Sequence, residues 1–153
     1  MGFGPKMKLE IEKLNENVPT PKYATSGSAA FDLTNQSGKT IQIHPGETVI
    51  IPTGIKVKLP SGTAGFISSR SGKSLQGFRV ANAPGIVDED YRNEVGVIAA
   101  NDKDGIVTVE PGERIAQFTV LPVIRCDIAV VESIDIEENN ERGLGGFGSS
   151  GSH

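Results

Sequence analysis

The sequence has no tryptophan, one cysteine and two histidines, and these shortages exclude several kinds of site. Cys126 has no partner in its own chain, so no intrachain disulfide can form and a reducing compartment is expected. Cys126, His44 and His153 are too few to build the usual zinc site of sulfur and nitrogen ligands within one chain. The stability of the fold must therefore come from a hydrophobic core.

Long apolar runs are also missing. No stretch approaches the roughly 20 apolar residues of a membrane span, and the N-terminus lacks the apolar segment of a secretory signal. The formal net charge of −4 argues against a general nucleic-acid binder, which normally has a basic surface. We expect neither a membrane nor nucleic acid as a direct partner, and a cytoplasmic location or the equivalent compartment of a virus-infected host.

The apolar period of an amphipathic helix is absent from every window of about a dozen residues. Short segments with β character instead alternate with turn signals such as Pro45-Gly46 and Pro111-Gly112. Residues 55–59 alternate apolar and polar side chains, whereas 48–51 and 95–100 are more continuously apolar. The pattern predicts an all-β sandwich, barrel or jelly roll.

The composition changes after Ile134. Residues 137–141 are acidic and polar, and the chain beyond them is rich in glycine and serine, with too little apolar surface to offset the entropy of ordering. The sequence therefore predicts a β domain over residues 7–134 and a flexible C-terminal segment over 135–153. Residues 1–6 precede Met7 and are treated as an extension outside the domain.

The first candidate site is the hydroxyl-rich stretch SSRSGKS at residues 68–74. Such a turn can present backbone N–H groups, two hydroxyls and the guanidinium of Arg70 to phosphate oxygens. An ordinary solvated loop with a basic flank is the alternative interpretation.

The second candidate is the stretch from Asn82 to Glu94. A hairpin here would set Asn82, Asp88 and Tyr91 near a common pocket, where an amide can bind the polar edge of a pyrimidine and a carboxylate can take a proton from water. The alternative is an acidic solvated turn at residues 88–90 with Tyr91 as a core aromatic.

Two further polar residues lie in apolar surroundings. Strand alternation places Arg114, Ala116 and Phe118 on one face and Gln117 on the other, among apolar neighbours, so Gln117 needs a hydrogen-bond partner. A structural bond to backbone would satisfy it. Asp32 lies inside a short apolar run, so it is either paired structurally or directed toward a cation or water.

The C-terminal stretch RGLGGFGSSG carries one cation, Arg142, and one aromatic ring, Phe147, among glycines. Composition alone favours a disordered linker. A lid that closes over a bound ligand is the alternative.

Five stretches, taken in order, resemble the five motifs of the trimeric dUTPases. They are SAAFDL (28–33), SSRSGKS (68–74), NAPGIVDEDYRNE (82–94), ERIAQFTV (113–120) and RGLGGFGSSG (142–151). The resemblance implies hydrolysis of dUTP to dUMP and pyrophosphate, which limits uracil incorporation into DNA and supplies dUMP for thymidylate synthesis. It also implies a distorted jelly-roll-like β-barrel, a homotrimer with shared sites and a flexible C-terminal tail, and Mg²⁺ held by triphosphate and water with no direct protein ligand.

The same resemblance assigns roles to residues that match the motifs. Asp88 would deprotonate the water that attacks the α-phosphorus, and Asp32 would support water and metal nearby. The base and sugar would contact Asn82, Gly85, Ile86, Val87, Asp88 and Tyr91. The phosphates would contact Arg70, Ser71, Gly72 and Gln117, and the closing tail would supply Arg142, Phe147, Gly148, Ser149 and Ser150.

Lys73 departs from the family pattern, because the second motif usually continues there with a small apolar residue. It could add a cation near the phosphates or face solvent. Two other functions stay open at this point: a nucleotide-gated interaction protein that uses the same dUTP site, and a deaminase that acts on dCTP within the same fold.

Overall fold

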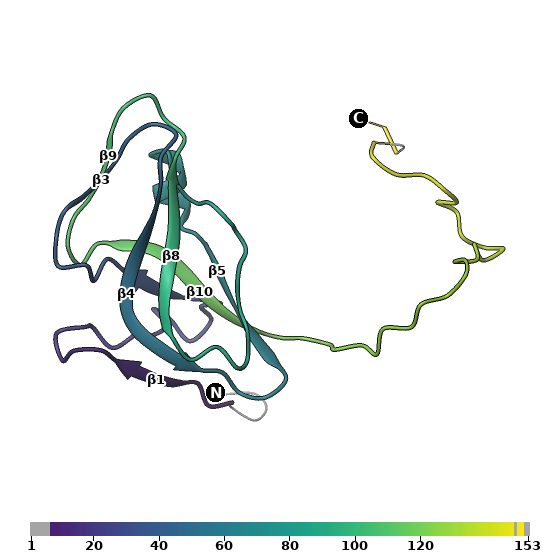
Figure 1. The fold of residues 1–153 in the computed structure, drawn as a ribbon, viewed down its shortest axis with the longest axis horizontal. Helices are drawn as coiled ribbons and strands as arrows, with labels where there is room; N and C mark the ends of the chain where they lie inside the picture. The colour runs from purple at the N-terminus through teal and green to yellow at the C-terminus, as the bar shows by residue number, and fades with distance from the viewer. Residues whose placement is uncertain (1–6, 149, 152–153) are drawn as a thin grey trace.

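Ten β-strands and one short α-helix form the body of the protein in the described part of the chain (Figure 1). The structure is a computed structural model that describes residues 7–148, 150 and 151. The elements are β1 (Glu10–Lys13), β2 (Phe31–Thr34), β3 (Ile41–Ile43), β4 (Thr48–Lys58), β5 (Thr63–Ser69), α1 (Ser71–Leu75), β6 (Phe78–Val80), β7 (Gly85–Val87), β8 (Glu94–Asn101), β9 (Val107–Val109) and β10 (Arg114–Pro122). This content confirms the predicted all-β class.

The strands pair antiparallel in two four-stranded sheets and one two-stranded ribbon. One sheet has the order β1-β4-β8-β6, the other has the order β2-β10-β5-β7, and the ribbon joins β3 to β9. Both four-stranded sheets are open among the described residues, so the jelly-roll-like fold keeps edge strands at β1, β6, β2 and β7. The edge position of β7 matters for the site described below.

One hydrophobic core takes side chains from both four-stranded sheets, including Ile51 and Val97 from the first and Phe118 from the second. The Phe118 ring is fully buried and stacks on Phe31 with 5.2 Å between ring centroids. Gly65 of β5 lies against this ring: a Cβ there would come within 2.9 and 3.0 Å of Phe118 Cε1 and Cε2, and closer still to Cζ. Only glycine leaves room for the ring at this point in the sheet.

Strand β4 continues through two residues that normally interrupt strands, Pro52 and Gly54. Its register against β8 shifts between Pro52 and Lys56, and Gly54 has a φ of 72°, which favours glycine. The Gly54 N–H donates to Glu94 Oε2 at 3.0 Å. The segments predicted separately at 48–51 and 55–59 therefore belong to one bent strand, which ends at Lys58.

Two buried asparagines fasten the β3–β9 ribbon to the body. Asn101 Nδ2 donates to the carbonyl oxygens of Ile43 at 2.9 Å and Gly105 at 2.7 Å. Asn35 Nδ2 donates to the carbonyl oxygen of Glu110 at 3.0 Å. Each amide thus replaces backbone pairing where the chain turns away from a sheet.

The chain beyond Pro122 leaves the body and extends away from it, as the green to yellow part of Figure 1 shows. Several of its apolar side chains are almost fully exposed, with Ile124 at 92%, Ile128 at 93% and Val130 at 96%. Among the described residues, no helix has the length and apolar character needed to cross a membrane.

Candidate active site

A cavity of about 190 Å³ lies beside β7 and the residues that flank it. The site residues that line it are Asn82, Gly85, Ile86, Val87 and Tyr91. Strand β7 pairs only with β5, so one edge of its backbone makes no ladder bonds within the described residues. An apolar cavity beside an exposed amide and free strand backbone can hold a flat heterocycle and bind its polar edge.

Tyr91 is fixed at the border of this cavity. Its hydroxyl donates to the carbonyl oxygen of Glu94 at 2.8 Å, and its backbone N–H donates to the carbonyl oxygen of Asp88 at 3.1 Å. The ring is partly exposed, so the interpretation of Tyr91 as a core aromatic is wrong. An anchored ring with one open face can pack against a sugar.

Asp88 lies on the other side of β7. Side chains alternate along a strand, and Gly85 and Val87 are buried whereas Ile86 and Asp88 are exposed. Asp88 lines a second cavity of about 480 Å³, and Ile86 borders both cavities. Asp88 therefore does not line the cavity of Asn82, and the hairpin predicted over residues 82–94 is wrong, because β7 pairs with β5 and not with β8.

The hydroxyl-rich stretch forms a tight turn from β5 into α1. Arg70 is the N-cap residue of α1 and has extended backbone angles, and its carbonyl oxygen accepts the N–H of Ser74 at 3.0 Å. Ser71 and Gly72 follow in the first turn and are exposed. The turn thus presents a guanidinium, a hydroxyl and glycine backbone on one surface, which are groups that bind phosphate oxygens.

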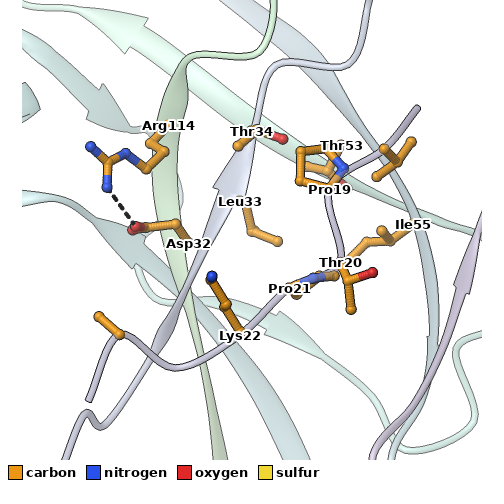
Figure 2. Close-up of a pocket in the computed structure, with 12 residues that line it drawn as sticks. Pro19, Thr20, Pro21, Lys22, Asp32, Leu33, Thr34, Thr53, Ile55 and Arg114 are labelled. Atoms are coloured by element: carbon orange, nitrogen blue, oxygen red, sulfur yellow. Dashed lines mark ion pairs between the residues drawn. The ribbon is translucent and has the colours of Figure 1, made fainter. Parts of the chain in front are cut away.

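Asp32 of β2 joins this turn through two ion pairs. Its Oδ1 lies 2.9 Å from Arg70 Nε, and its Oδ2 lies 3.8 Å from Arg114 Nη1. Figure 2 shows the Asp32–Arg114 pair at the rim of a cavity of about 210 Å³, which residues 18–22 also line. The carboxylate holds two guanidinium groups together on the surface that carries Ser71.

Arg114 reaches Asp32 because of a bulge that the sequence pattern does not reveal. The register of β10 against β2 shifts between Arg114 and Ala116. Ile115 and Ala116 are therefore both buried while Arg114 is exposed, so the predicted shared face of Arg114, Ala116 and Phe118 is wrong at its first member. In the sequence, the only indication that Arg114 lies at the site was its position in the ERIAQ stretch, close to Gln117.

Gln117 contacts the backbone at the start of the turn that carries Arg70, Ser71 and Gly72, which we call the phosphate turn. Its Nε2 donates to the carbonyl oxygen of Ser69 at 3.3 Å, and Ser69 directly precedes Arg70. The structural bond to backbone that the sequence allowed for Gln117 is therefore present. This bond joins β10 to the end of β5, where the turn begins.

Asp88 and the phosphate turn lie toward opposite ends of β5, with the cavity beside β7 (the base cavity) between them. Gly85 pairs with Ile67, which also lines the base cavity, so this cavity begins three residues from Arg70 (70 − 67), or about 10 Å at about 3.3 Å per residue. Val87 pairs with Gly65, five residues from Arg70 (70 − 65) or about 17 Å, and Asp88 lies one residue beyond Val87. Asp88 and the phosphate turn of one chain therefore do not meet in one place.

The described tail residues extend away from the body (Figure 1). Arg142 and Phe147 are exposed, with Phe147 completely so. Phe147 has a φ of 35° and Gly148 a φ of 85°, so the backbone turns sharply here. Ser150 is also exposed, while Ser149 lies outside the described residues. The described part of the chain has no group of three or more His, Cys, Asp and Glu side chains placed to hold a metal ion.

A β-sandwich that combines a base-sized cavity on an edge strand with an arginine–serine phosphate turn is a nucleotide-binding protein. Within that class, the chain belongs to the dUTPase family, whose sequence profile matches residues 16–151. That range includes all of the residues just described.

Individual relatives agree with this assignment. The chain is 44% identical over 146 residues to the deoxyuridine 5′-triphosphate nucleotidohydrolase of Hydrogenobaculum sp. (strain Y04AAS1), covering 95% of this chain and 99% of that one. The dUTPase of Staphylococcus bacteriophage 80alpha, solved with dUPNHPP, is 27% identical with a TM-score of 0.84, over 96% of this chain and all of that one. A variant dUTPase of Staphylococcus aureus phage phi11, solved for the coordination of a structural Mg(II) ion, shares the fold at 22% identity and a TM-score of 0.73, over 85% of this chain and all of that one.

Proposed function

We propose that this chain hydrolyses dUTP to dUMP and pyrophosphate. The cavity on the edge of β7, lined by Asn82 and Tyr91, carries the proposal in a chain that belongs to the dUTPase family. A water oxygen attacks the α-phosphorus, the bond to the bridging oxygen of the β-phosphate breaks, and the water proton passes to a base. The reaction lowers the dUTP available for incorporation into DNA and supplies dUMP for thymidylate synthesis.

The base is bound by Asn82 and by the backbone of residues 85–88, and the sugar packs on Tyr91. The free edge of β7 supports this role, because the N–H and C=O groups on that edge pair with no other strand among the described residues. Cytosine would leave buried groups unpaired, which rejects it strongly. A 2′-hydroxyl would meet the Tyr91 ring, which rejects UTP.

Asp88 is the proposed general base. Its side chain is exposed in a wide cavity, where a water molecule and a phosphate can both approach it. Arg70, Ser71 and Gly72 receive the phosphate chain, while Gln117 holds the turn through Ser69. Asp32 orients Arg70 and supports water and metal beside the phosphates.

Mg²⁺ enters the proposal with the substrate. Phosphate oxygens and water are the ligands that Mg²⁺ prefers, together with one or two carboxylates. Asp32, a carboxylate beside the phosphate turn, fits that ligand set through water. The ion would neutralise part of the triphosphate charge and help to orient it.

We propose that residues 135–153 form a lid over the bound nucleotide, while residues 7–134 belong to the β domain. Phe147 would stack on uracil, Arg142 would meet the phosphates, and the backbone of residues 148–150 would wrap the terminal phosphate. The ordering entropy of the lid would be offset by contacts made only when nucleotide is bound.

We also propose a homotrimer whose sites are shared between subunits. The separation of more than about 17 Å between Asp88 and the phosphate turn along β5 supports this arrangement. One subunit would supply the β7 cavity and Asp88, and another would supply the phosphate turn. The C-terminal tail would cross between subunits to reach the shared site.

The exposed segment that follows β10 supports contact between subunits. Residues 124, 126 and 128 are apolar, and they alternate with Arg125 and Asp127. This pattern is typical of a strand with one buried face, yet the segment makes no strand pairing within the described residues. A neighbouring subunit would cover this face.

The direct test is incubation of the purified protein with Mg²⁺ and equal concentrations of dUTP, UTP, dCTP and dTTP, followed by measurement of pyrophosphate and nucleotide products. Selective conversion of dUTP to dUMP is expected. Inert dUTP would contradict the proposal, and ammonia released from dCTP would indicate a deaminase.

Shared sites can be tested by mixing Asp88→Asn and Arg70→Ala proteins after partial unfolding and refolding together. Each variant alone is expected to be inactive, whereas a mixed trimer contains sites with both native residues. Recovery of activity in the mixture would support sharing, and none would contradict it.

The nucleotide-gated interaction function is not favoured, because the curated relative is named as a nucleotidohydrolase. An unchanged set of captured partners with and without dUPNHPP is expected. We place the enzyme in the cytoplasm or its equivalent in an infected host, since its one cysteine, Cys126, is unpaired and exposed.

A further inference from the structure

Lys73 holds a position in α1 that the proposed reaction does not use. The sequence left two roles for it, a cation near the phosphates or a solvent-facing charge. Its side chain is only 11% exposed, and its Nζ forms an ion pair with the carboxylate of Glu113. The same Nζ lies 5.8 Å from the ring centroid of Phe78, which is fully buried. Lys73 therefore faces the body of the protein.

Helix α1, which carries Lys73, is too short to be stable by itself. It has five residues, none of them buried, and no side-chain hydrogen bond at its N-cap. Isolated helices of this length are unstable in water, because nucleation costs more than so few backbone bonds return. The orientation of α1 therefore depends on contacts with the rest of the fold, including those of its side chains.

Two ion pairs supply those contacts, one on each side of Ser71 and Gly72. Arg70 is tied to Asp32 of β2 at 2.9 Å. Lys73 is tied to Glu113, which directly precedes β10. Ser71 and Gly72, the residues proposed to receive phosphate, lie between these two ties and are exposed.

We expect the two ion pairs to respond differently to bound substrate. A triphosphate competes with Asp32 for the Arg70 guanidinium, because both are anions that pair with it. The Lys73–Glu113 pair is shielded, and Glu113 is itself fixed, since its carbonyl oxygen accepts the N–H of Asn35 at 2.9 Å. We expect this second ion pair to stay intact when phosphate replaces Asp32 beside Arg70.

We propose that Lys73 is a positioning residue that, through Glu113, holds Ser71 and Gly72 in the orientation that receives the triphosphate of dUTP. This inference rests on the proposed function and adds to it a residue outside the expected binding set. It identifies the departure from the family pattern at position 73 as a support for the phosphate turn.

The test compares Lys73→Met, Glu113→Gln and the double variant with Arg79→Met. Arg79, on β6, is the matched control, because its ion pair with Asp102 at 2.7 Å is more exposed than the Lys73–Glu113 pair and includes neither the turn nor Glu113. Steady-state kinetics with dUTP, affinity for dUPNHPP and affinity for dUMP are measured for each protein.

Both single variants are expected to raise the KM for dUTP and weaken dUPNHPP binding by about fivefold to tenfold, a typical coupling within one ion-pair network. The kcat should stay within about twofold, because an interaction equal in ground and transition states affects KM alone. The double variant should be no worse than either single variant. The affinity for dUMP and all values for Arg79→Met should stay unchanged.

Unchanged dUPNHPP binding by Glu113→Gln would overturn the proposal, because the ion pair would then not affect the turn. Tighter binding would also overturn it, because Lys73 released from Glu113 would then contact phosphate directly. A parallel loss of dUMP affinity and melting temperature would also overturn it, since general destabilisation would then explain the effect.

Hydrogen exchange in the nucleotide-free protein separates this inference from the proposed function. Amides of residues 71–75 should exchange faster in Lys73→Met than in wild type or Arg79→Met, whether or not the wild type hydrolyses dUTP. Unchanged exchange would overturn the tie, whereas inert wild-type protein with faster exchange in Lys73→Met would overturn only the function.

Discussion

Replacement of Gly65 by alanine tests whether the contact between β5 and the Phe118 ring is as close as the structure shows. The new Cβ would lie 2.9 Å from Cε1, about 0.5 Å inside ordinary contact (3.4 − 2.9), and deeper still at Cζ. Phe118 cannot retreat, because it is fully buried and stacked on Phe31. Overpacking a rigid core costs about 1–3 kcal/mol, and we expect the upper end of this range.

The measurement is urea unfolding at one fixed protein concentration, since oligomer stability depends on concentration. A loss near 3 kcal/mol corresponds to a fall in melting temperature of about 6–12 °C for a chain of this length. Gly27→Ala is the matched control, because nothing lies within 4 Å of the added methyl group. Its effect should stay within about 0.5 kcal/mol.

A second change separates the ring contact from a general effect of losing glycine. Phe118→Leu in the Gly65→Ala background makes room for the methyl group, so the double variant should lose less stability than the two single losses added together. A Gly65→Ala protein that unfolds at the wild-type midpoint, or exactly additive losses, would refute the packing argument. We also expect a raised KM for dUTP, because Gly65 pairs with Val87 beside the base cavity.

Three further outcomes are expected. Asp88→Asn should lower kcat by about 10²–10⁴-fold, the usual contribution of a general base, with dUPNHPP affinity retained by calorimetry; near-normal turnover would remove Asp88 from that role. Deletion of residues 142–153 should greatly reduce turnover without lowering the melting temperature, and a matching loss of stability would show that the tail belongs to the core. Asn101→Ala should destabilise the protein by about 1–3 kcal/mol in urea unfolding, because the carbonyl oxygens of Ile43 and Gly105 lose their donor; an unchanged midpoint would contradict this assignment.

The sequence predicts the fold class well, because turn signals and alternation are local properties. It does not predict α1, since five residues are too few to show a helical period. It also divides β4 in two at Pro52, because the bond between Gly54 and Glu94 that carries the strand through joins residues far apart in the chain.

The candidate site likewise has features that local sequence patterns predict and features that depend on contacts between residues far apart in the chain. Motif order places Asn82, Arg70 and Asp32 in the site, and the structure pairs Arg70 with Asp32. The side on which Asp88 lies follows from strand alternation along β7, so it could have been predicted. The turn of Arg114 toward Asp32 depends on a bulge, which no pattern in the ERIAQ stretch specifies.

The pairing of Asp32 with two arginines also bears on selectivity among anions. Without nucleotide, the guanidinium groups of Arg70 and Arg114 already have a counter-charge, so this surface is not a bare cationic patch. Inorganic phosphate or a nucleic-acid backbone would have to displace the Asp32 carboxylate from these arginines, and it would make few other contacts with the protein in return. Only a ligand that brings a base, a sugar and several phosphates together makes enough contacts to displace it, and once the pyrophosphate has left, the carboxylate can return and favour release of dUMP.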